Sequence, residues 1–212
     1  MKNATNEVSA SRRNNQVVTA AAALGLALLV AACTATGDAG GAPAVTETAG
    51  GLLEATASYD DNGVTLDYPA EWRTLDQTTQ AASVGNELWS QGFGPSETGA
   101  NVAIVKAYQL QLDVTDVPAA DLMAEIDATL DRLTEQTGGR RVGEVRASRL
   151  GSLSGFEATV NSTGPSGQLV ESRVVFAFDR DVEYFLNCQY EPDAESEILA
   201  GCDTIQRSFS VR

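Results

Sequence analysis

The chain has 212 residues and a formal net charge of −15 at pH 7, with 29 acidic side chains, 14 basic side chains and no histidine. Such a surface repels nucleic acid, whose binding depends on Lys and Arg side chains that neutralise phosphates. Without histidine the chain lacks the commonest general base and metal ligand, and the usual partner of a serine or cysteine nucleophile. The composition therefore predicts no nucleic-acid partner, and no catalytic residue, metal ligand or cofactor is assigned.

The N-terminal residues 1–32 have the pattern of an export signal peptide. Arg12 and Arg13 precede an apolar run at residues 17–32, which is shorter than the roughly 20 apolar residues that span a membrane. The sequence Val-Ala-Ala-Cys at residues 30–33 resembles the lipobox of bacterial lipoproteins. This resemblance implies cleavage before Cys33 and a diacylglyceryl group, with chains such as palmitate, on its sulfur. Two or more acyl chains anchor a protein stably, so we predict attachment to the extracytoplasmic face of the cell membrane.

Two alternatives to this interpretation stay open. The segment could be an uncleaved anchor helix, or an ordinary cleaved signal in which Cys33 is incidental. The export route is open too, because Ser11-Arg12-Arg13 resembles part of a twin-arginine signal. Polar Asn15 and Gln16 stand where that signal prefers hydrophobic residues, which favours the general secretory route.

Residues 33–51 are mainly Ala, Gly, Thr and acidic residues without a hydrophobic period, which predicts a flexible tether. The folded part is predicted to span residues 52–212. A segment of this length is one domain of ordinary size, large enough to bury a proper core.

Turn residues and apolar periods predict an antiparallel β-domain with two helices. Asn62-Gly63 is a strong hairpin signal, because both residues tolerate positive φ. The glycine-rich residues 92–99 are expected to form a plain loop. Strands are expected at residues 64–68, 88–89, 101–105, 142–148, 155–161, 169–178 and 182–190, the last four as a meander.

The first helix is predicted at residues 117–137, where apolar residues recur at intervals of four and three. Asp116 is placed to help cap its start, and Gly138 is placed to end it. A second helix is expected after Pro192, with an apolar face that includes Cys202. In the preceding strand, Cys188 lies on the face opposite Glu183, Asn187 and Gln189.

Cys188 and Cys202 thus lie on two apolar faces that should pack together. We predict a disulfide between them, because the chain enters a compartment that permits disulfides and Cys33 is accounted for. Two buried free thiols or a redox pair are the alternatives. A redox pair is disfavoured, because neither cysteine has a nearby Lys or His to lower its pKa.

Two segments resemble a known family. Residues 64–72, Val-Thr-Leu-Asp-Tyr-Pro-Ala-Glu-Trp, resemble the opening strand of PsbP-like and Mog1-like domains, and residues 205–211 are similar to their closing segment. The resemblance implies an α+β fold, a three-layer α/β/α sandwich around a central antiparallel sheet. It also implies that Tyr68, Pro69, Trp72 and Phe209 serve as core and turn residues.

The resemblance brings no catalytic motif, since the better-known relatives are accessory subunits or protein-binding modules. We therefore expect a non-catalytic, membrane-anchored binding or accessory domain of the cell envelope, whose partner is an unknown envelope protein or small ligand. One alternative is a hydrolase or transferase that uses two carboxylates. The other is a carrier of a small apolar ligand, for which an enclosed apolar pocket of at least about 300 Å³ would speak.

Overall fold

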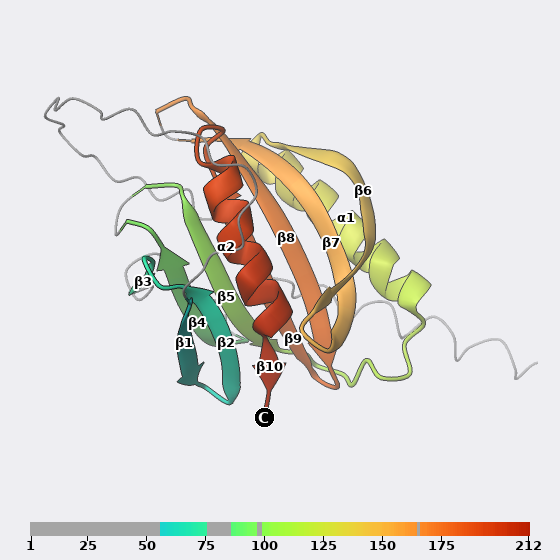
Figure 1. Ribbon diagram of the computed structural model, residues 1–212. Helices are drawn as coiled ribbons and strands as arrows, with labels where there is room; N and C mark the ends of the chain where they lie inside the picture. The colour runs from blue at the N-terminus through green and yellow to red at the C-terminus, as the bar shows by residue number, and fades with distance from the viewer. Residues whose placement is uncertain (1–55, 76–85, 97–98, 165) are drawn as a thin grey trace, which may run out of the picture.

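The computed structural model describes residues 56–75, 86–96, 99–164 and 166–212. They form an antiparallel sheet of seven strands, a second sheet of three short strands and two helices (Figure 1). The elements are β1 (Thr56–Asp61), β2 (Val64–Pro69), β3 (Arg73–Leu75), β4 (Glu87–Gly94), β5 (Val102–Gln109), α1 (Ala119–Thr137), β6 (Arg140–Leu150), β7 (Leu153–Thr163), β8 (Leu169–Asp179), β9 (Val182–Tyr190), α2 (Glu195–Ser208) and β10 (Ser210–Val211).

The large sheet has the strand order β3-β4-β5-β9-β8-β7-β6, and α1 and α2 lie on its opposite faces (Figure 1). The small sheet, β1-β2-β10, shares the layer of α2. The predicted fold class, an α+β sandwich with a central antiparallel sheet, is therefore confirmed. The predicted meander is confirmed as well, because β6, β7, β8 and β9 are neighbours in chain order.

The opening and closing segments of the domain meet in the small sheet. The predicted hairpin joins β1 to β2 through Asn62 and Gly63, whose φ angles are 51° and 75°. On its other side β2 pairs with β10, so that Ser210 lies opposite Thr65. The hydroxyl of Ser208 also accepts a hydrogen bond of 2.8 Å from the backbone of Asp67.

Two apolar cores lie on the two faces of the large sheet. The first fills the space between the sheet, α2 and the small sheet, and it includes Trp72 and Phe209. The ring of Trp72 packs against Gly201 of α2, where a Cβ atom would clash with it. The second core lies between the sheet and α1. Trp72 and Phe209 are thus core residues, as the family resemblance implied.

The predicted disulfide is confirmed, since Cys188 of β9 and Cys202 of α2 form a bridge between fully buried residues. Their Cα atoms are 6.1 Å apart and their sequence separation is 14. A loop of about this length contributes roughly 3 kcal/mol in the chain-entropy account of disulfides. The bridge fixes α2 to the middle of the sheet.

The first helix agrees with its predicted apolar stripe but not with its predicted cap. Ile126, Leu130 and Leu133 are buried, and Gly138 ends the helix in the left-handed conformation at φ 67°. The N-cap residue is Pro118, and no side chain makes a capping hydrogen bond. The proposed role of Asp116 is therefore wrong.

The prediction of a plain loop at residues 92–99 is wrong for its first part. Strand β4 continues through Gly94, and Phe93 has no exposed surface. Its ring contacts the rings of Tyr59 and Tyr68 at centroid distances of 5.6 and 4.9 Å. Burying one phenylalanine stabilises a fold by about 1.5–3 kcal/mol, which outweighs the weak strand propensity of the two glycines beside it.

The predicted signal peptide, the tether and Cys33 lie outside the described residues. In the part of the chain that the structure describes, neither helix is long and apolar enough to cross a membrane.

The contact between Gly201 and Trp72 gives a first prediction. Gly201→Ala should lower the free energy of unfolding by about 1–3 kcal/mol, because the added methyl group overpacks the core against a rigid ring. Chemical denaturation measures the change. In the double variant with Trp72→Phe, whose ring is smaller, the cost of the alanine should shrink. Equal costs in both backgrounds would contradict the packing argument.

Candidate functional site

A groove of about 710 Å³ lies where the first turn of α1 faces the ends of β6, β7 and β8. Its floor is formed by Phe156 and Phe178, which point toward the α1 side of the sheet. Val114, Val117 and Leu122 form a wall on the opposite side. The groove is open to solvent rather than enclosed, so it differs from the closed pocket expected for a carrier of an apolar ligand.

The segment that precedes α1 and forms a wall of the groove is held in place by backbone hydrogen bonds. The amide groups of Leu110 and Val114 donate to the carbonyls of Asp181 and Arg180 in the β8–β9 turn, at 2.7 and 2.9 Å. Asp113 accepts hydrogen bonds from the hydroxyl and the amide of Thr115, which hold its pKa below the ordinary value. The apolar wall is thereby presented on an ordered segment.

Charged side chains are among those that line the groove. Arg149 donates a hydrogen bond of 2.7 Å to the carbonyl of Ser152 and has no carboxylate partner among the described residues. The Nε atom of Arg180 lies 3.6 Å from Oδ1 of Asp179, and 73% of the Arg180 side chain is exposed. The groove therefore combines an apolar floor with accessible guanidinium groups.

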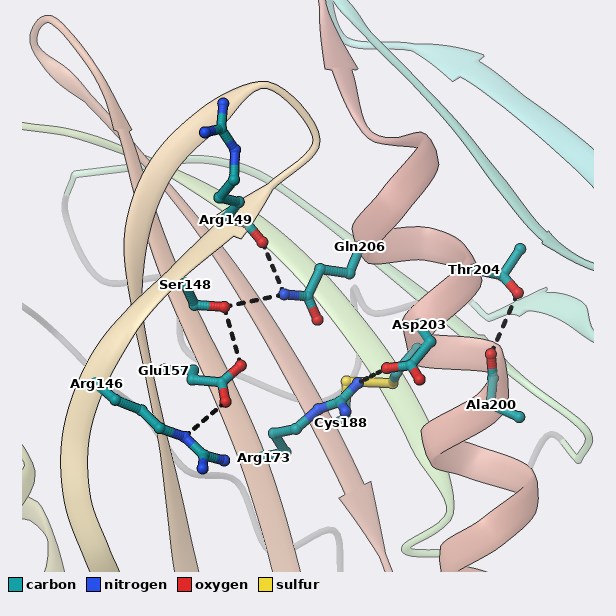
Figure 2. Close-up of polar contacts among 11 residues, drawn as sticks. Arg146, Ser148, Arg149, Glu157, Arg173, Cys188, Ala200, Asp203, Thr204 and Gln206 are labelled. Carbon is teal, nitrogen blue, oxygen red and sulfur yellow. Dashed lines mark hydrogen bonds and ion pairs between the residues drawn. A yellow bond between two sulfur atoms is a disulfide. The ribbon is translucent and has the colours of Figure 1, made fainter. Parts of the chain in front are cut away.

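A polar network lies on the other face of the sheet, between β6, β7 and α2 (Figure 2). Glu157 accepts a hydrogen bond of 2.9 Å from the hydroxyl of Ser148 and pairs with Arg146 at 2.8 Å. Gln206 donates to the Ser148 hydroxyl at 3.1 Å and to the carbonyl of Arg149 at 2.7 Å.

The contacts of Glu157 join β6 to β7, and those of Gln206 join α2 to β6. A separate ion pair, at 2.6 Å, joins Arg173 of β8 to Asp203 of α2 (Figure 2). Both oxygens of Glu157 are occupied, and the Ser148 hydroxyl donates to that carboxylate while accepting from Gln206. We interpret the network as structural. No group of three or more Cys, Asp or Glu side chains placed to hold a metal ion occurs among the described residues.

A carboxyl group is buried behind the groove. Glu183 of β9 has no exposed surface and lies opposite Tyr108 of β5 and Phe178 of β8. Neither of its oxygens has a hydrogen-bond partner among the described residues. Burial raises its pKa to about 8, so the group is mainly neutral at pH 7. Burial, together with Glu87 and Glu183, also raises the pKa of Tyr108.

The structure brings none of the predicted site residues to the groove. Cys188 and Cys202 are buried on the other face of the sheet, and Cys33 lies outside the described residues. Sequence reasoning did not single out Glu183. The sequence signal that could have found it is Phe185, which lies two residues further on and shares the same face of the strand.

No family model matches the chain, and no curated protein matches it. Among solved structures, it is similar to cyanobacterial PsbP (CyanoP) from Synechocystis sp. PCC 6803, with a TM-score of 0.52 and 13% identity over 80% of this chain and 98% of that one. It is also similar to LpqN, involved in cell envelope biogenesis of Mycobacterium tuberculosis, with a TM-score of 0.50 and 16% identity over 74% and 90%. The described domain is an α+β sandwich. More specifically, it has the PsbP-like fold that the sequence resemblance implied.

Glu183 gives a prediction about stability and pH. Its pKa is about 8 in the folded chain against an ordinary 4.5. The unfolded chain therefore loses this proton first, and stability should fall as pH rises from about 4.5 to about 8. At about 1.4 kcal/mol per unit, the fall is on the order of 5 kcal/mol.

Glu183→Gln should remove this decline, which denaturation at a series of pH values measures. The exposed Glu135 of α1 supplies the matched control, because Glu135→Gln should reproduce the pH dependence of the unsubstituted chain. A Glu183→Gln curve parallel to that of the unsubstituted chain would contradict a neutral buried carboxyl.

Proposed function

We propose that this chain is a membrane-anchored, extracytoplasmic accessory domain that binds a partner of the cell envelope without transforming it. The observation that carries the proposal is the open groove of about 710 Å³, with an apolar floor, ordered walls and two arginines in its lining. A concave, mainly apolar site with a few convergent polar groups is the usual form of a binding site.

The anchor in this proposal is the lipid expected on Cys33. The tether at residues 33–51 would set the domain off from the bilayer, and the excess of acidic side chains would keep its body away from anionic headgroups. LpqN, which shares the fold, is described as involved in cell envelope biogenesis, and this supports an envelope role for the present chain.

The non-catalytic part of the proposal follows from the side chains that are present. The sequence contains no histidine. Ser148 and Glu157, a serine and a carboxylate in contact, hold each other and Gln206 in place. Robust turnover of a small substrate by the purified chain would contradict this part.

Substitution of the anchor cysteine tests the location. In the host bacterium, Cys33→Ser should move the chain from the membrane fraction to the soluble extracytoplasmic fraction and abolish labelling by radioactive palmitate. The physical reason is that the acyl chains supply the membrane affinity. Retention of Cys33→Ser in the membrane would show that another segment anchors the chain.

Substitution in the groove tests binding. Val117→Asp places a charge on the apolar wall and should abolish cross-linking of the anchored chain to its envelope partner. Leu88→Asp is the matched control, because Leu88 of β4 is 52% exposed and does not line the groove. Circular dichroism verifies that both variants fold. Equal cross-linking by the two variants would exclude the groove as the binding site.

A further inference from the structure

Strand β6 carries a concentration of positive charge in an acidic chain. Its eleven residues include Arg140, Arg141, Arg146 and Arg149 and only one acid, Glu144. The whole chain has 14 basic and 29 acidic side chains. Pairing with β7 shows which faces they occupy: Arg141 and Arg149 point to the α1 side, and the other two arginines point to the α2 side. Arginine side chains therefore project from both faces of β6.

Much of this charge remains accessible. Arg140 is exposed, and like Arg149 it has no carboxylate partner among the described residues. Arg146 pairs with Glu157, yet 72% of its side chain is exposed. Only Arg141 is largely committed, through contacts with Asp127 and Asp131 of α1.

Strand β6 is also the last strand of the large sheet (Figure 1). Within the described domain only β7 pairs with it, so the backbone N–H and C=O groups on its outer edge have no strand to bond. A register shift between Val142 and Arg146 bends this edge. Arginines and a bend discourage pairing between copies of the chain, because like charges would lie opposite each other.

The end of this edge runs into the groove. Ala147, Ser148 and Arg149 of β6 belong to the groove lining together with Phe156 and Phe178. A segment that lies along β6 therefore reaches an apolar surface within a few residues, since an extended chain advances about 3.3 Å per residue.

We propose that the partner docks through an acidic, extended polypeptide segment that lies along β6. This segment places an apolar side chain on the floor of the groove. The inference rests on the proposed function. Carboxylates complement the arginines, and backbone groups of the segment complement the free edge. A lipid offers no series of backbone groups to a strand edge. The open groove also suits one side chain better than an acyl chain that must be buried along its length.

Short synthetic peptides test the proposal with the full-length chain. The probe is a fluorescein-labelled, glutamate-rich peptide with one central phenylalanine, and fluorescence anisotropy measures its binding. A second peptide has serine in place of the phenylalanine, and a third has lysine in place of every glutamate. We expect the first peptide to bind, the second to bind more weakly and the third not to bind. Added salt should weaken binding because it screens the exposed charges.

Arginine variants locate the site. Arg140→Gln combined with Arg149→Gln should weaken binding of the first peptide roughly tenfold, as expected for the loss of two solvent-exposed ion pairs. Neither arginine has a carboxylate partner among the described residues, so the double variant should fold. The matched control is Arg207→Gln, since Arg207 is an exposed arginine on α2, and its affinity should be unchanged.

The proposal is overturned if the first peptide does not bind, if the lysine peptide binds equally well, or if Arg207→Gln weakens binding equally. Binding of palmitate or phosphatidylglycerol vesicles at the groove in place of the peptide would also overturn it. Cross-linking separates this result from failure of the proposed function. If the double arginine variant still cross-links to the envelope partner while Val117→Asp does not, the function stands and the acidic segment is excluded.

Discussion

The burial of β9 on both faces is the constraint on which the rest of the structure depends. One face packs with α2 and carries Cys188, and the other faces the α1 side and carries Glu183 and Phe185. Because β5 and β8 pair with this strand along nearly its whole length, the two halves of the sheet are joined through it. The disulfide then ties the second helix to the same strand, so both cores share one fixed element.

This central position explains how a carboxyl group comes to be buried without a partner. In an antiparallel sheet with one wet face, alternating residues meet water, and an acid at position 183 would be hydrated. Here Tyr108 and Phe178 lie opposite Glu183 on the neighbouring strands. Because the Glu183 carboxyl is buried, its ionisation costs more free energy and its pKa is raised. Phe178 also lines the groove, so the groove and the buried acid share a neighbouring side chain.

The parts of the fold with a clear period could be predicted from the sequence. Two long elements show this: α1, with the apolar stripe of Ile126, Leu130 and Leu133, and β9, with its alternation. The sequence predicts both elements. Phe93 was missed because the glycines beside it resemble a loop, whereas its contacts with Tyr59 and Tyr68 come from another sheet. The groove was not predictable for the same reason: its walls come from segments that meet only in the folded chain, and no local pattern marks them.

The pairing of β2 with β10 has a consequence for the order of folding. Ser208, which contacts Asp67, follows it by 141 positions, so the small sheet cannot close until the last residues of the chain are present. Contacts between distant residues form slowly, because loop closure precedes them. The hairpin of β1 and β2 therefore lacks the third strand of its sheet until β10 has been made. Loss of β10 would leave β2 with a free edge, although these two strands lie at opposite ends of the domain's sequence.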